Sequence, residues 1–241
     1  MPRIKSVIRD FVGFIYYNGY KRFMSYGNRC LIYHAFGSKL NHDTYGISIN
    51  IDKFESHIRH LSTNYNIVNI NDVTSNDLRV SISIDDGYKD TLDAVNILVK
   101  YDIPFTLFIT AKNLNKKMYL SNRDLNDISL IKNAKIGTHG LSHSKLGTLS
   151  YKEQYHELSL SKKILEDLIS KDVNLVSYPH GSYNNDTLSI IDKIGYKYAA
   201  CSKKGFNSIN TNKYLLHRSE IIASDEVINL TSKIKGYYDY Y

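Results

Sequence analysis

The sequence predicts an α/β fold with a mainly parallel sheet, and three observations support this. Short runs rich in β-branched residues alternate with stretches of helical spacing. Such alternation is typical of successive strand–helix units. No repeat, low-complexity tract or Gly/Pro-rich linker divides the 241 residues. That length suits one barrel of roughly 200–250 residues, so we expect a (β/α) barrel, with an open sheet as the alternative.

The first half of the chain supplies several strand–helix units. The run RCLIYH at 29–34 reads as a strand. The stretch 51–65 carries apolar residues every three or four positions, which indicates one face of a helix. The other elements expected here are strands at 66–70, 79–84 and 103–110 and a helix at 90–102.

The second half continues the series. A strand is expected at 134–137, and the longest helix at 150–170, where Ser150 and Glu153 form a capping box. The elements that complete the series are strands at 173–178 and 196–201, a helix at about 186–194 and a terminal strand near 215–221.

Composition excludes some classes of protein. The net charge is +7, but the lysines are scattered, which indicates a solvated basic surface and no nucleic-acid partner. No apolar run approaches the 18 or so residues of a membrane span. The only two cysteines, Cys30 and Cys201, have apolar or small neighbours and are expected to be free, buried thiols.

The N-terminal segment 1–28 is predicted to be an amphipathic helical segment that precedes the main domain. Its apolar run is short and no small-residue cleavage site follows, so we expect it to be retained in a cytoplasmic protein. A basic amphipathic helix can lie on an anionic membrane, here the inner face, but packing on its own domain is the favoured interpretation. The apolar stripe consists of Ile4, Val7, Ile8, Phe11, Phe14 and Ile15.

Chemically capable side chains follow two of the expected strands. Asp85 and Asp86 come directly after 79–84, and His139 and His143 follow 134–137. Parallel folds gather active sites at the carboxyl ends of their strands. On a helical turn, the i, i+4 histidines would share one side and suit a single metal. One aspartate could then be a third ligand and the other a base; a surface pair and a loop cap are the alternatives.

Two weaker signals lie at other strand ends. His34 ends the first strand and could protonate a leaving group, although a structural histidine is the commoner role. Pro179 and Gly181 predict a tight turn whose backbone N–H groups could face an oxyanion, although Pro-x-Gly is usually only a turn.

The set SIDDG, HGLSH and YPHGSY resembles the polysaccharide deacetylases of the NodB-homology group, carbohydrate esterase family 4. The resemblance runs from about 29 to 222. LIYHAF and SIDDGYKDT look like the branch with an N-terminal Tyr-His strand, which includes poly-N-acetylglucosamine deacetylases. It implies a distorted (β/α) barrel of the NodB-homology type, forming a catalytic domain over 29–241.

The resemblance also implies an activity and its residues. A divalent metal, usually Zn²⁺ with Co²⁺ or Ni²⁺ as alternatives, would be held by Asp86, His139 and His143. Asp85 would be the general base. The backbone N–H of His180 would bind the oxyanion. The general acid would be His34, with His217 of the LLH run as the alternative.

The implied reaction removes acetyl groups from an N-acetylated amino sugar during surface-polysaccharide biosynthesis. The sugar could be a polysaccharide, an oligosaccharide, or a lipid-linked or nucleotide-linked precursor. An O-acetyl esterase and a non-catalytic carbohydrate-binding relative are the alternatives. Departures from the family pattern are Gly140 in place of Ser or Thr, Ser177 in place of an arginine, and the absence of tryptophan.

Overall fold

The computed structural model describes residues 2–20 and 27–240, and the side chains of 8–20 and 27–240. It contains one eight-stranded sheet with the order β7-β6-β5-β4-β3-β1-β8, and β2 pairs with β3. Every strand pair is parallel. The strands are β1 Asn28–Tyr33, β2 Asn66–Ile67, β3 Arg79–Ile84, β4 Phe105–Ile109, β5 Ala134–Thr138, β6 Leu175–Ser177, β7 Tyr198–Ala200 and β8 Arg218–Glu220.

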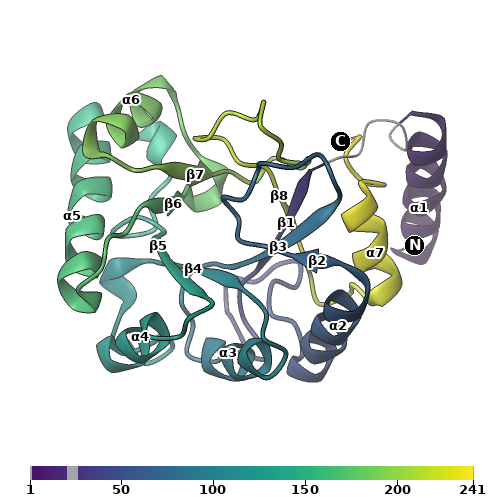
Figure 1. Ribbon diagram of the computed structural model, residues 1–241, viewed down its shortest axis with the longest axis horizontal. Coiled ribbons are helices and arrows are strands. Elements are labelled where there is room, and N and C mark those ends of the chain that lie inside the picture. The colour runs from purple at the N-terminus through teal and green to yellow at the C-terminus, as the bar shows by residue number, and fades with distance from the viewer. Residues whose placement is uncertain (1, 21–26, 241) are drawn as a thin grey trace.

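The two ends of the sheet come together just before β8. Leu216 forms a parallel bridge with Ala200 of β7. Its N–H donates to Ala199 O at 2.9 Å, and its carbonyl accepts from Cys201 N–H at 2.9 Å. The sheet therefore curls into a nearly closed barrel (Figure 1), which confirms the barrel prediction.

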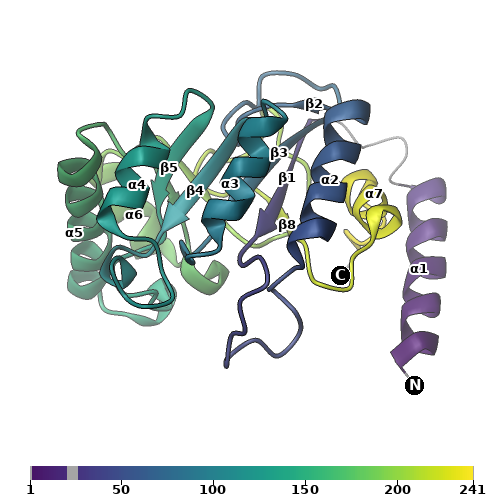
Figure 2. The same cartoon turned by 90° about the horizontal axis from the view of Figure 1, so that it is seen from below.

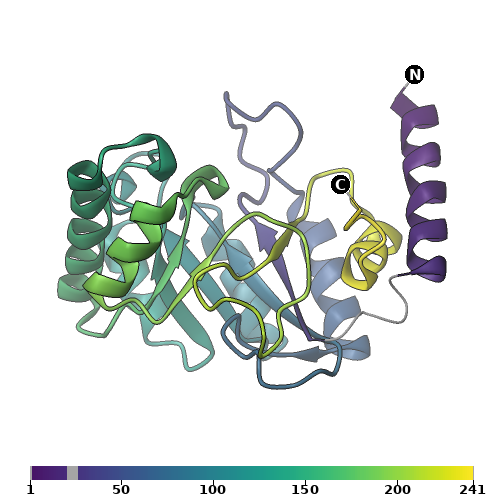
Figure 3. The ribbon, with the colours of Figure 1, turned by 90° about the horizontal axis from the view of Figure 1, so that it is seen from above.

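Helices surround most of this barrel. In Figure 1, α5 and α6 lie at the left, α2, α3 and α4 below, and α7 and then α1 at the right. Figure 2 shows α2, α3 and α4 in front of the sheet, and Figure 3 shows the segment between β7 and β8 crossing the opposite side. The helices are α1 Pro2–Gly19, α2 Ile51–Asn64, α3 Thr91–Lys100, α4 Asn122–Ser129, α5 Tyr151–Ile169, α6 Asn185–Ile194 and α7 Val227–Lys235.

The strand residues divide between two apolar environments. Leu31 and Ile82 belong to the large core cluster that includes residues of α2 and α3. Cys30 belongs to a smaller cluster with Phe108 and Leu216. Neighbours in a strand point to opposite faces, so both faces of β1 are buried. Cys30 and Cys201 are free and buried, as predicted.

The predicted helices at 51–65, 90–102, 150–170 and 186–194 are confirmed to within two residues at either end. The Ser150–Glu153 capping box is also present. Helices α4 and α7 were not predicted from the sequence. In α4 the buried apolar side chains are only Leu125 and Ile128, too few to show a helical period. The strand expected over 66–70 is confined to Asn66–Ile67.

The N-terminal helix α1 packs on its own domain, as favoured, with Tyr17 against Tyr237. It does not pack through the predicted stripe, because Ile8, Phe11, Phe14 and Ile15 are 54–64% exposed. The side chains of Ile4 and Val7 lie outside those described. In the described part of the chain, no helix has the length and apolar character that crossing a membrane requires.

Candidate metal centre and active site

The predicted site residues gather at the carboxyl ends of the strands. His34 follows β1, Asp85 and Asp86 follow β3, and His139 follows β5. These four side chains, with His143, His180 and Glu220, line one pocket of about 540 Å³. A volume of this order suits a small-molecule ligand.

Asp86, His139 and His143 form a cluster with metal-ligand geometry. Asp86 Oδ1 lies 3.5 Å from His139 Nε2 and 3.1 Å from His143 Nε2. The three candidate ligand atoms lie within 4.8 Å of one another. Asp86 Oδ1 is buried and has no hydrogen-bond partner among the described residues. A buried carboxylate oxygen facing two imidazole nitrogens fits a divalent metal, and three protein ligands leave a position open.

The two histidines do not lie on a helical turn. The segment from His139 to His143 is a loop after β5, so the expected helical geometry is wrong. The rings nevertheless come together, with centroids 4.9 Å apart. Three residues of the site adopt left-handed backbone conformations: Asp86 (φ 71°), His143 (φ 64°) and His180 (φ 58°). Non-glycine residues in this region carry strain, and such residues cluster at functional sites.

A buried carboxylate holds this loop in place. Glu157 Oε2 accepts from the N–H groups of Leu141 (3.0 Å) and Ser142 (2.9 Å). Its Oε1 accepts from Ser142 Oγ at 2.6 Å. Gly140 has φ +74°, a conformation that disfavours the Ser or Thr usual in the family at this position. Glu157 and Ser142 therefore organise the loop that carries both histidines.

The protonation of His139 and His143 follows from their surroundings. Burial lowers the pKa of His139 to about 4, which keeps the imidazole neutral. The imidazole Nδ1 lies 2.9 Å from Ser177 O, so this nitrogen carries the proton and Nε2 is free to bind a metal. Burial opposes the charge of His143, but the nearby Asp86 carboxylate raises its pKa above the usual value.

Asp85 is fixed by Arg218, a residue that the sequence did not indicate as part of the site. Arg218 Nη1 donates to Asp85 Oδ1 at 2.8 Å, and Nη2 donates to Oδ2 at 2.9 Å. Ser177 accepts from Arg218 Nη2 at 2.6 Å and donates to Asp85 Oδ2 at 3.1 Å. Burial opposes ionisation of Asp85, but the Arg218 charge holds its pKa below the usual value. Arg218 thus holds Asp85 in a bidentate ion pair, although the residue at position 177 is a serine.

The two candidate acids are placed differently. His34 lines the pocket, and its Nδ1 lies 3.9 Å from Glu220 Oε1, which also accepts from the Tyr45 hydroxyl at 3.2 Å. His217 does not line this pocket. It precedes β8, whose first residue, Arg218, points to Asp85 instead.

The turn after β6 lies at the same pocket. Gly181 N–H donates to Tyr178 O at 2.9 Å, and Ser182 N–H donates to Pro179 O at 3.0 Å. Neither bond uses the N–H of His180. The His180 ring lines the pocket, with its centroid 4.5 Å from that of His143.

Comparisons with known proteins agree with this geometry. YxkH of Bacillus subtilis, provisionally named a polysaccharide deacetylase, is 28% identical over 203 residues, covering 79% of this chain and 70% of that protein. Poly-β-1,6-N-acetyl-D-glucosamine N-deacetylase of Staphylococcus aureus is 27% identical over 160 residues, covering 61% of this chain and 55% of its own length. The chain thus spans about half the length of this relative.

The structure of the deacetylase PplD from Streptococcus pyogenes, in complex with acetate, superposes with a TM-score of 0.76 at 22% identity, covering 86% of this chain and 97% of the other. The polysaccharide deacetylase family model matches residues 72–199. This match takes in more than half of the chain and includes the Asp-Asp, His-x-x-x-His and Pro-x-Gly segments of the pocket. The chain therefore belongs to the polysaccharide deacetylase family.

Proposed function

We propose that this protein is a metal-dependent N-deacetylase that hydrolyses the acetamido group of an N-acetylated amino sugar. The observation that carries the proposal is the position of Asp85 beside the Asp86–His139–His143 cluster. Asp85 Oδ2 lies 3.8 Å from His139 Nε2, so the candidate base and the candidate metal ligands lie side by side in the same pocket. The membership of the chain in a deacetylase family supports the same reaction.

Asp86, His139 and His143 would hold the metal, and one carboxylate with two imidazoles is a ligand set that suits Zn²⁺. When bound, a divalent ion polarises a carbonyl oxygen and increases the acidity of water. The hydrogen bond from His139 Nδ1–H to Ser177 O keeps Nε2 directed at the ion.

Asp85 would accept a proton from the attacking water. Its bidentate pair with Arg218 keeps the carboxylate ionised and restricts its rotation. The water oxygen forms a bond to the acetamido carbon, and negative charge moves to the carbonyl oxygen. The N–H of His180 would stabilise that oxyanion as it forms.

His34 would give a proton to the departing nitrogen as the C–N bond breaks, which releases acetate and an amine. Its Nδ1 lies 3.9 Å from Glu220 Oε1, so this carboxylate can orient the imidazole ring in the pocket. His217 lies outside the pocket lining, and we therefore place the acid at His34.

For the physiological substrate we propose a class of glycan and not a single sugar. The similarity to a poly-N-acetylglucosamine N-deacetylase supports an N-acetylglucosamine-containing glycan of surface-polysaccharide biosynthesis. We assign the catalytic domain to 29–241, with 1–28 as a separate N-terminal helical segment.

The experiment measures acetate released from N-acetylglucosamine oligosaccharides and from matched O-acetylated sugars. We expect release from the amide, and a loss of about 10²–10⁴-fold in Asp85→Asn. The matched variant Asp90→Asn removes another aspartate near β3, one that binds the Phe36 and Ser38 N–H groups instead. Release from esters alone would favour the O-acetyl esterase, and an Asp85→Asn enzyme with full rate would refute the base assignment.

A further inference from the structure

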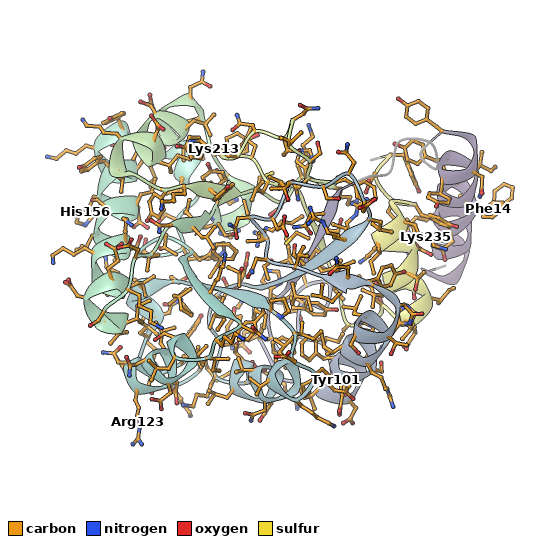
Figure 4. The ribbon with its side chains drawn as sticks, viewed as in Figure 1. Phe14, Tyr101, Arg123, His156, Lys213 and Lys235 are labelled. Carbon is orange, nitrogen blue, oxygen red and sulfur yellow. The ribbon has the colours of Figure 1, made fainter. Side chains whose placement is uncertain are left out.

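Helix α1 presents an unpartnered apolar face. The exposed apolar side chains on this face are Ile8 (58% exposed), Phe11 (64%), Val12 (41%), Phe14 (54%) and Ile15 (54%). Figure 4 shows Phe14 at the outer edge of the molecule, pointing away from the body. Helical spacing places these residues along one side.

The opposite side of α1 is the one that packs. Gly13 is buried, and a Cβ there would lie 2.7 Å from Tyr237 O, so only glycine allows this approach. The ring of Tyr17 lies 4.5 Å from that of Tyr237, and Tyr238 donates its hydroxyl proton to Asp10 at 3.0 Å. The helix is therefore held with its apolar stripe turned outward.

The charge of this segment indicates what covers the stripe. The first 24 residues contain five basic residues and one acidic residue, a net +4 of the +7 of the whole chain. A second copy of the chain would bring the same positive charge to the contact. An anionic lipid surface offers both the opposite charge and an apolar layer.

We propose that α1 docks this protein on an anionic membrane surface, with Ile8, Phe11, Val12, Phe14 and Ile15 inserted among the lipids. The helix lies in the interface and does not cross the bilayer. This docking is independent of the proposed deacetylase activity.

The main pocket lies near helix α1. A smaller cavity of about 170 Å³ is lined by Arg9 of α1 and shares Tyr45, Lys204 and Glu220 with the lining of the main pocket. In Figures 2 and 3 the N-terminal end of α1 extends on the same side as the loop that follows β1.

Co-sedimentation with vesicles tests the proposal on the full chain. We expect binding to mixed phosphatidylglycerol–phosphatidylcholine vesicles at low salt, and much weaker binding to phosphatidylcholine alone or at high salt. The triple variant Phe11→Ser, Phe14→Ser, Ile15→Ser should lower the partition constant roughly tenfold or more. The matched variant Ile209→Ser, Ile228→Ser removes exposed isoleucines elsewhere, 74% and 71% exposed, and should bind normally.

A second measurement does not depend on how the triple variant folds. The chain has no tryptophan, so Phe14→Trp introduces a single tryptophan on the stripe, which can be excited selectively over the tyrosines. Its emission should shift to the blue with anionic vesicles, whereas that of Ile209→Trp should not. Absence of vesicle binding by the parent, equal loss in both serine variants, or no shift of Phe14→Trp would overturn the proposal. The proposal would also be overturned if the parent formed a dimer that did not bind vesicles and that the triple variant dissociated.

Discussion

Arg218 of β8 forms a bidentate ion pair with Asp85 at the end of β3, although β1 lies between these two strands. Both side chains are buried. The guanidinium also donates to Ser83 Oγ and to the Cys201 carbonyl, both at 3.1 Å. A single arginine thus fixes the proposed base and connects three segments of the barrel.

Replacing Arg218 should impair catalysis as well as stability. Arg218→Met leaves Asp85 buried without its partner, which we expect to cost about 3–5 kcal/mol of unfolding free energy. Arg218→Lys keeps the charge but cannot reproduce the two-pronged contact, so kcat should fall about tenfold to a hundredfold. Urea unfolding and acetate release measure the two effects.

Arg29 provides the matched control. It is equally buried, and it pairs with Asp239 at 2.8 Å outside the main pocket. Arg29→Lys should lower stability and leave the kcat of the folded enzyme unchanged. Equal losses of kcat in both lysine variants would mean that Arg218 acts only through the fold.

The Asp85–Arg218 pair also predicts a pH dependence of stability. Because the pKa of Asp85 is lower in the folded state than in the unfolded chain, its contribution is fully present above about pH 4. It is lost as the pH falls through the folded pKa, since the unfolded chain then binds the proton first. As the pH falls below about 4, the unfolding free energy of the metal-free protein should therefore decrease more steeply than that of metal-free Asp85→Asn. Identical slopes in urea titrations would contradict the depressed pKa.

Substrates with different leaving groups distinguish His34 from His217 as the general acid. His34→Gln should lower kcat on N-acetyl sugars about 10²–10⁴-fold, because an amine leaves poorly without a proton. An activated acetate ester, whose phenolate leaves without protonation, should lose much less. His217→Gln should alter neither rate, since that side chain does not line the pocket. The opposite pattern would move the acid to His217.

Glu157 should control metal affinity without contacting the metal. Its carboxylate accepts three hydrogen bonds from the loop between His139 and His143. Glu157→Gln replaces this charged acceptor by a neutral amide, which weakens the hydrogen bonds that hold the loop. We expect zinc affinity to fall about tenfold to a hundredfold. Competition with a zinc chelator measures this. Glu153→Gln, on the same helix, affects only the capping box and should retain parental affinity.

Much of the candidate site could be predicted because its residues follow strands directly. Asp85, Asp86 and His139 stand at the ends of recognisable β runs, and parallel strands bring those ends to one edge. Arg218 could not be found in this way. Its contact with Asp85 depends on β8 pairing with β1, and sequence spacing does not show which strands are neighbours.

Two further differences have separate physical causes. The i, i+4 spacing of His139 and His143 predicted a helical turn, but Gly140 and the bonds to Glu157 favour a loop. The amphipathic pattern of α1 identified two faces correctly. It could not show that the side with Gly13 and Tyr17 packs, because that depends on the distant C-terminal tyrosines.

Metal content of the purified protein, measured by mass spectrometry, tests the central claim most directly. The parent protein should hold about one equivalent of divalent metal per chain, and His143→Ala should lose it. His42→Ala is the matched control, because His42 lines the same pocket but its Nε2 lies 3.1 Å from the Tyr88 hydroxyl, outside the ligand cluster. A parent protein that binds no metal after incubation with zinc, or a His143→Ala variant that keeps a full equivalent, would contradict the account.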